Sequence, residues 1–397
     1  MPRYSSQSIT SSTTSLSSDA SVKIYEERLK PRIETKMNSG ATLQGLVDTA
    51  DKIVTEVFAL DPRSTFTYKK KDEETSVQLD KVMTAMLAFA EECGGQSGKR
   101  YVASAICCCS EDEDVVGALA ALGTTWLTHF LFVFRASRGH PNQLNQTPSE
   151  VETPTVDQSA IGNRKISFAD DVIKRDGYAC ILTRSQDLAH PNPVEEIFTT
   201  SLVAAHILPS LWAVGQFDED HNSYKSALTT FDILVNYTHL PVQTLEQLRD
   251  KLDHPSNGMT LQLDARGAFD RFDWCLKKTE IENAYDLKVF RDRGIMKKPN
   301  RITFEDRSND FSDSTRNLKR NAPVDLPNPH YIEIHAAIAG ILHMSGTGKF
   351  FDELLNNNKE DRDKVSPVRC WTELEKLMEE RLLRDSIIES FQLATVY

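Results

Sequence analysis

Apolar residues recur at helical spacing through the first third of the chain. The repeat of three and four positions predicts three helices, over Leu43–Leu60, Ser76–Glu92 and Tyr101–Cys109. Gly94 and Gly95 stand between the second and the third, where they would end a helix. Residues 23–135 are therefore predicted to form an all-helical module.

The segment Val115–Phe134 carries no ionised side chain over 20 positions. That length is sufficient for a membrane span. Thr124, Thr125 and Gly123 interrupt its apolar character, which favours a buried helix of the helical module over a span. A membrane-tethered protein stays open as the weaker alternative.

Changes in composition divide the rest of the chain. The beginning is rich in Ser and Thr and almost lacks large apolar residues, which is typical of disorder. Pro141, Pro148 and Pro154 stand among polar residues and indicate a linker. The predicted units are a disordered segment (1–22), the helical module (23–135), a linker (136–165), a core domain (166–290), a basic and polar loop (291–326) and a helical C-terminal region (327–397). The last unit has helical spacing over His330–His343 and Trp371–Leu393.

The core domain departs from purely helical spacing. An apolar, strand-like run closes at His206, and Asn257-Gly258 is a strong turn dipeptide. The segment that follows starts extended and becomes helical near Asp264. Between His206 and Asn257 lie 50 residues, which carry two helical segments, Tyr224–Tyr237 and Leu245–Leu252. This insertion must fold back so that His206 and Asn257 can meet, which loop-closure entropy permits.

This order of motifs resembles the HNH nuclease family, in the branch with an Ala-His-Ile motif that is typical of fungal proteins with an HNH nuclease domain. The positions that carry the resemblance are Cys180, Thr183, Ala205-His206-Ile207, Asn257, Phe269 and Asp270. The resemblance implies a ββα-metal unit, in which a β-hairpin and a helix grip one divalent ion. It also implies that the substrate is nucleic acid, with DNA expected before RNA, and that the reaction is phosphodiester hydrolysis.

The same resemblance assigns catalytic roles. His206 would act as the general base, because a neutral imidazole can accept a proton near pH 7. Asn257 would fix the hairpin and orient His206, since its amide can bridge backbone groups. Mg²⁺ or Mn²⁺ would neutralise the charge that builds on the phosphate.

The chain departs from the family pattern at its metal ligands. The family's second histidine falls on Arg266, whose guanidinium stays protonated and cannot bind a metal. The position before His206, which is a carboxylate or histidine in many HNH proteins, is Ala205. Three nearby groups are the substitute ligands that the sequence offers, namely Asp270, Asp264 and His254, although residues of this kind are more often caps or surface residues.

Arg266 suits a different task, because a guanidinium pairs well with phosphate oxygens. Lys297 and Lys298 lie in a locally basic stretch and are predicted to add phosphate contacts. A salt bridge from Arg266 to Asp270, four residues further along a helix, is the alternative.

Charge and cysteine content limit the other possibilities. The net charge of −12 is unsuited to a protein coated with basic surface, so nucleic acid would need a local basic patch. The seven cysteines have no paired spacing typical of zinc sites and are expected to be reduced intracellular thiols. The N-terminus has no secretory pattern. A nuclear or cytoplasmic protein is expected.

The sequence thus predicts an α+β protein, with a helical N-terminal module, an HNH-like ββα-metal core, a long helical insertion and a helical C-terminal tail. Two functions stay open: an HNH nuclease, and a non-catalytic protein that binds nucleic acid through a degenerate site or a protein partner through the helical module. They differ in whether a carboxylate or imidazole besides His206 points into the site.

Overall fold

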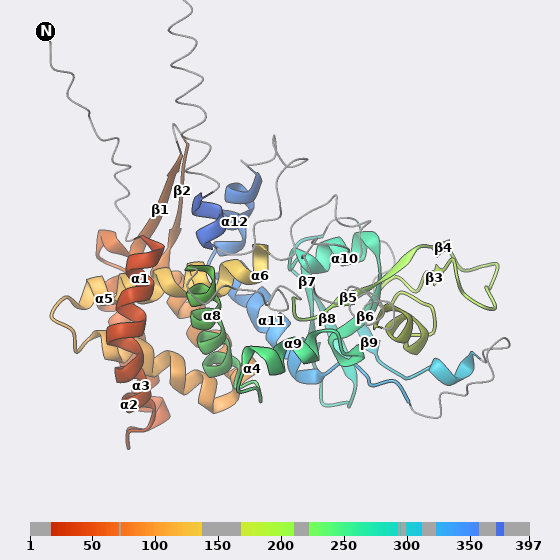
Figure 1. The fold of residues 1–397 in the computed structure, drawn as a ribbon, viewed down its shortest axis with the longest axis horizontal. Helices are drawn as coiled ribbons and strands as arrows, with labels where there is room; N and C mark the ends of the chain where they lie inside the picture. Colours follow the sequence, from red (N-terminus) through yellow and green to blue (C-terminus); the bar gives the residue numbers. More distant parts are fainter. Residues whose placement is uncertain are drawn as a thin grey trace, which may run out of the picture.

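The computed structural model describes residues 17–70, 73–136, 168–209, 222–292, 294, 299–311, 323–356 and 371–376. Within these ranges the protein is an α+β structure in which most helices lie toward one end of the molecule and most of the small sheets toward the other (Figure 1). The α+β class predicted from the sequence is confirmed.

The N-terminal module begins earlier than expected. Helix α1 starts inside the segment predicted to be disordered, because Ser17 caps it by accepting a hydrogen bond from the backbone N–H of Ala20. The prediction for 1–22 is therefore wrong at its end, and residues 1–16 lie outside the described ranges. The first helical elements are α1 (Ser18–Ile24), η1 (Tyr25–Leu29), α2 (Lys30–Met37), α3 (Leu43–Lys52) and η2 (Ile53–Phe58).

The module is not all-helical, which corrects the prediction. After the short turn η3 (Pro62–Ser64), strands β1 (Thr65–Lys70) and β2 (Glu73–Gln78) pair as an antiparallel hairpin. The helix predicted from Ser76 starts instead at Leu79. A run that alternates β-branched and aromatic residues in β1 is a strand signal, and the helical periodicity of its neighbours masked it.

The second and third predicted helices follow one another directly. Element α4 (Leu79–Cys109) consists of two helices that meet at a kink, because Gly95 has non-helical backbone angles, with φ 57° and ψ −153°. Glycine adopts this backbone conformation without the steric penalty of other residues. The glycine pair thus ends the first helix, as the sequence predicts, and the second helix begins directly after the kink, earlier than predicted.

The uncharged segment forms the centre of the module. Helices α5 (Val115–Thr125), η4 (Trp126–Leu131) and α6 (Phe132–Ala136) are continuous. Among the described residues, this is the helix long and apolar enough to cross a membrane, and 83% of its most apolar window is buried inside the protein. Burial of that extent is what a core helix shows. Ala136, the first residue of the predicted linker (136–165), belongs to α6. The other residues of the predicted linker lie outside the described ranges.

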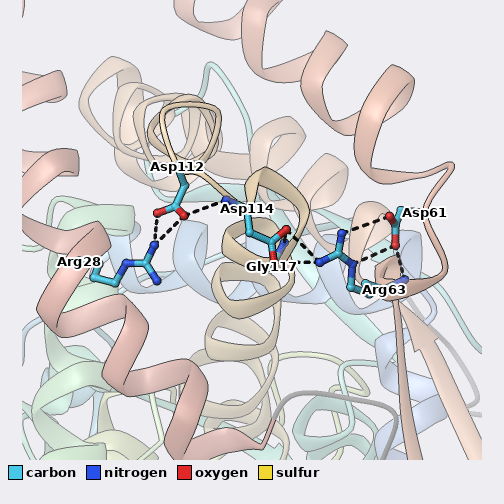
Figure 2. A network of polar contacts seen from close by, with 6 residues as sticks. All are labelled: Arg28, Asp61, Arg63, Asp112, Asp114 and Gly117. Carbon is cyan, nitrogen blue, oxygen red and sulfur yellow. Dashed lines mark hydrogen bonds and ion pairs between the residues drawn. The ribbon is translucent and has the colours of Figure 1, made fainter.

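A polar network fixes the beginning of this helix (Figure 2). Asp114 caps α5 by accepting the Gly117 N–H at 3.0 Å, and both of its oxygens receive Arg63 Nη1 at 2.9 Å. The neighbouring Asp112 accepts a hydrogen bond from Arg28 at 2.6 Å. Burial alone would raise the pKa of Asp112, but its hydrogen bonds hold that pKa below the ordinary value. The network joins η1, η3 and the N-terminal end of α5.

The insertion packs against the N-terminal module. Helix α8 (Asn222–Thr238) lies against α4 and η4, and α9 (Leu245–Leu252) leads the chain back. Tyr237 donates a hydrogen bond to the Met86 carbonyl at 3.0 Å. A Cβ built on Gly94 or Gly98 would come within 2.0 or 2.2 Å of the Tyr237 carbonyl oxygen, so only glycine permits this approach of α8 to α4.

The core domain contains the predicted hairpin and helix. Strands β5 (Leu202–His206) and β6 (Gly258–Gln262) pair antiparallel, and α10 (Leu263–Asp270) follows directly. A three-stranded sheet comes next, formed by β7 (Trp274–Lys278), β8 (Ala284–Val289) and β9 (Arg301–Thr303). Strand β9 and the turn η8 (Ser308–Asp310) lie in the predicted loop 291–326, which is therefore partly structured. Strands β3 (Gln186–Asp187) and β4 (Thr199–Thr200) form a short parallel pair at the end of the molecule opposite α1 (Figure 1).

The C-terminal region packs against both the N-terminal module and the core domain. The predicted helix over His330–His343 is present as α11 (Pro329–Met344), which packs against both α4 and β7. Helix α12 (Thr347–Asn356) packs against β2 and α6. Of the predicted helix over Trp371–Leu393, residues 371–376 are helical and the rest is not described. Helical module, core domain and C-terminal region thus share one hydrophobic core.

Candidate functional site

A buried arginine fixes the chain that precedes the hairpin. Arg175 is fully buried at the end of helix 168–175 and pairs with Asp176 at 2.8 Å. Its guanidinium donates to the carbonyl oxygens of Pro255 and Gly258, each at 2.8 Å. Asp176 in turn accepts the Thr260 N–H at 2.7 Å. A buried arginine needs this many partners to offset its desolvation. This role was not predicted from the sequence, where the only local signal is the Arg175-Asp176-Gly177 sequence, which is typical of a turn.

Cys180 also organises the hairpin. Its thiol is fully buried and accepts the backbone N–H groups of Thr183 at 3.3 Å and of Gln262 at 3.2 Å. The backbone of Ile181 then bonds to the Thr260 carbonyl at 3.0 Å. Cys180 and Thr183, two of the positions that carry the family resemblance, therefore form a turn packed on β6.

The register of the hairpin places His206 opposite Gly258. A Cβ on Gly258 would lie 2.7 Å from Val172 and 2.8 Å from the ring of Phe168. Helix 168–175 thus covers this end of the hairpin, and glycine makes the close packing possible. Gly258 is the first residue of β6 and its backbone is extended (φ −127°, ψ 156°), so glycine is required here for space, and the turn predicted at Asn257-Gly258 is not formed.

Asn257 holds the loop beside His206, as the sequence predicts for its amide. It is fully buried. Its Oδ1 accepts the Leu208 N–H at 2.8 Å, while Nδ2 donates to the carbonyls of Leu208 at 3.1 Å and Leu252 at 2.9 Å. A backbone bond from Ile207 to the Asn257 carbonyl, 2.8 Å long, closes the loop. The two ends of the 50-residue insertion are thereby joined.

His206 has a stacked neighbour and a carboxylate partner. The Phe168 ring lies parallel to its imidazole, with centroids 4.3 Å apart and an interplanar angle of 9°. His206 Nε2 lies 3.2 Å from Asp253 Oδ1, and the His206 side chain is 14% exposed. A carboxylate on one ring nitrogen fixes the orientation of an imidazole and can determine its tautomer. Asp253 is the partner that the sequence analysis missed, one position before the residue it selected.

Arg266 forms the salt bridge to Asp270 that the sequence offered as the alternative to a phosphate contact. Arg266 Nε lies 3.4 Å from Asp270 Oδ2 across one turn of α10, and both side chains are 16% exposed. The two groups form an ion pair but not a hydrogen bond, and Arg266 Nε is a buried nitrogen that lacks a hydrogen-bond partner. The position that the resemblance gives to the second histidine therefore carries a cation that is already paired with a carboxylate.

The other predicted ligands are dispersed. His254 caps the turn η7 (Pro255–Asn257), where its Nδ1 lies 2.9 Å from Ser256 Oγ, and its Nε2 lies 3.6 Å from Asp325. Asp264 is exposed in the first turn of α10. Lys297 and Lys298 lie outside the described residues, so their predicted phosphate contacts stay predictions.

The described residues do not fit a divalent metal. Hard ions require several oxygen or nitrogen donors around one point. Among the described part of the chain, no three His, Cys, Asp or Glu side chains gather as such a group. His206 and Asp253 form a pair, and the next family position carries the positive charge of Arg266. Repulsion between this guanidinium and a divalent cation would further weaken metal binding.

The comparison with protein families agrees with the ββα order. Residues 180–277 match the family described as HNH endonuclease, which spans Cys180, the hairpin, the insertion and α10. The match supports the HNH family for this segment and a function related to nucleic acid. HNH nucleases generally use divalent metals, and the described residues of this chain form no group of three that could hold one. No curated protein and no solved structure matches the chain.

Proposed function

We propose that the HNH-like domain binds nucleic acid and does not cleave it by the metal-dependent route. One observation carries this proposal: Arg266 occupies the family's ligand position and pairs with Asp270. A guanidinium can exchange one carboxylate for the oxygens of a phosphate. We therefore assign to Arg266 a contact with the nucleic-acid backbone, supported by Lys297 and Lys298.

Binding is tested by fluorescence anisotropy with a short DNA duplex and its RNA counterpart. We expect affinity that falls with salt and is unchanged by EDTA, because phosphate contacts release counterions and need no metal. Arg266→Ala should weaken binding by about tenfold, the order expected for the loss of one charged hydrogen bond, and should reduce the salt dependence. Arg301→Ala removes an exposed arginine that pairs with Asp286 and is the matched control. Equal affinity of the two variants contradicts the assignment.

A second candidate is phosphodiester hydrolysis with His206 as the general base. The pair between His206 and Asp253 favours it, because a carboxylate besides His206 does lie in the site. Asp253 would hold the imidazole in position while the other ring nitrogen accepts a proton from water. In this chain Asn257 would be a positioning residue, since its bonds reach backbone groups.

Plasmid nicking separates the two candidates. Wild type, His206→Ala and Arg266→His are compared in Mg²⁺, in Mn²⁺ and in EDTA. Binding without cleavage by the wild type, with cleavage gained in Arg266→His, supports a binding domain silenced at one ligand. Cleavage by the wild type that disappears in His206→Ala supports the hydrolase. If Asp253→Asn also lost activity, Asp253 would be the group that orients the base.

Two broader assignments accompany this proposal. We place the chain in the Ala-His-Ile branch of the family, on Ala205-His206-Ile207, and expect a fungal origin. We also propose an intracellular location, nuclear or cytoplasmic, which the six described cysteines support because all are free and buried. The helical module stays a predicted contact surface for a protein partner.

A further inference from the structure

Large apolar side chains are concentrated in solvent on one loop of the HNH-like domain. The loop lies between β3 and β4, and we call residues 188–198 the β3–β4 loop. Phe198 is 70% exposed, Leu188 69%, Val194 45% and Ile197 41%. These are four of the ten most exposed large hydrophobic side chains in the described part of the chain. A concentration of this kind indicates a contact site, whereas scattered single residues would not.

The loop is held in shape from inside. Gln186 is 3% exposed, and its Nε2 reaches the carbonyl oxygens of Val194 at 2.6 Å and Ile197 at 3.1 Å. Its Oε1 accepts the Val194 N–H at 2.9 Å. Asp187 accepts the N–H groups of Ala189 and Leu202, both at 2.8 Å. The exposed apolar side chains are thus presented by an ordered backbone, which lowers the entropy lost on binding.

Charge in the loop selects the partner. Glu195 and Glu196 stand between Val194 and Ile197, and all residues from 191 to 198 are exposed. From residue 185 to residue 201 the chain has no lysine or arginine. Two carboxylates in this position repel the phosphates of nucleic acid. A symmetric contact between two copies of the chain would also bring the carboxylates of both copies together.

We propose that the β3–β4 loop docks a protein segment that carries an apolar anchor flanked by lysine or arginine. Such an anchor would pack on Phe198 and Leu188, and its basic neighbours would pair with Glu195 and Glu196. The surface is small, so the complex is a transient one. Phe198 precedes His206 by eight residues in a continuous β4–β5 segment, so the partner is held beside the HNH-like hairpin and away from the helical module (Figure 1).

The test is selection of short random peptides on the immobilised full-length protein, with counter-selection on Phe198→Ser. Selected peptides are then measured by fluorescence anisotropy against wild type, Phe198→Ser and a charge-reversed variant in which Glu195→Lys and Glu196→Lys are combined. Ile281→Ser is the matched control, because Ile281 is 57% exposed in the turn between β7 and β8. All substituted side chains are exposed, so the variants should keep the thermal midpoint of the wild type.

We expect the selected peptides to be enriched in an apolar residue next to lysine or arginine. Their affinity should fall by about tenfold in Phe198→Ser and stay unchanged in Ile281→Ser, as removal of one central anchor predicts. The charge-reversed variant should prefer matched peptides in which glutamate replaces the basic residues.

Three results would overturn the proposal. The first is the absence of enrichment, or peptides without a preference for basic residues. The second is a dimer, found by sedimentation, that dissociates in Phe198→Ser, because the occupant would then be a second copy. The third is nucleic-acid binding that Phe198→Ser removes and Arg266→Ala does not. None of these results depends on whether the domain cleaves nucleic acid.

Discussion

At the residue scale, Asn257 connects both ends of the insertion through one side chain. Asn257→Ala should lower the free energy of unfolding by about 3 kcal/mol, because it leaves buried backbone groups of Leu208 and Leu252 without partners. Urea denaturation measures the change. Asn300→Ala is the matched control, since Asn300 is an exposed asparagine and should change stability by less than about 1 kcal/mol. Equal effects would mean that the amide bonds contribute little.

His129 makes the stability of the helical module depend on pH. It is 2% exposed, and its Nε2 lies 2.7 Å from Ser18 Oγ. Burial lowers the pKa of His129 to about 4. The unfolded chain therefore binds a proton more readily than the folded one between pH 6.5 and about 4, and stability falls as pH decreases through that window.

The expected loss is roughly 3 kcal/mol between neutral pH and pH ~4, from the difference between an ordinary histidine pKa and the lowered one. Glutamine does not titrate, so between neutral pH and pH ~4 the His129→Gln variant should lose roughly 3 kcal/mol less unfolding free energy than the wild type. Denaturant titrations of both proteins across the window measure the difference. Because the other histidines and carboxylates are common to both, a difference near zero would mean that the buried imidazole is not the cause.

At the element scale, the glycines of α4 determine where the insertion packs. Gly98→Ala should destabilise the protein by about 3 kcal/mol or more, because the added Cβ would meet a backbone carbonyl that cannot move alone. Gly348→Ala in α12 is the matched control. Its nearest neighbour lies at 3.5 Å, so alanine should be neutral or stabilise by about 0.5 kcal/mol through helix propensity. Thermal unfolding of both variants tests the contrast, and similar midpoints would contradict it.

The local pattern of apolar and polar residues predicted the helices and strands better than it predicted which of them are in contact. The absence of ionised residues over 20 positions located Val115–Phe134, and helical spacing located His330–His343. The order from His206 through Asn257 to α10 followed from a strand, a turn dipeptide and a helix that are adjacent or marked by motifs. These signals depend on residues close together in sequence.

Long-range contacts were not predictable in the same way. Asp253 meets His206 only because the insertion folds back across 46 intervening residues. Arg175 lies in an Arg-Asp-Gly sequence, which is typical of a turn, and no local pattern indicates that it binds carbonyls of Pro255 and Asp325. The pattern of α8 shows that one face is buried, but it does not tell which part of the chain covers that face.

At the scale of the whole molecule, the helical module and the HNH-like domain are expected to be inseparable. Helix α8 belongs to the HNH-like domain by sequence and packs within the N-terminal module, and α11 packs against α4 and β7. Ile233, Leu234 and Tyr237 of α8 are fully buried, as are Ile334 and Ile338 of α11. Separation would expose these apolar side chains, which contribute about 1.5–3 kcal/mol each when buried.

A cut in the chain tests this expectation without deletion. A site for a specific protease is inserted within residues 137–167, and the purified protein is cleaved and passed over a gel-filtration column. We expect the two fragments to elute together and to separate only in denaturant, because the interface is a continuous core rather than a contact between domains. The same cut in Gly98→Ala should weaken the association, since that variant displaces α8 from α4. Fragments that separate and stay folded would show that the module and the HNH-like domain are independent. In that case, the packing of α8 on the module would not be needed to place Asp253 beside His206.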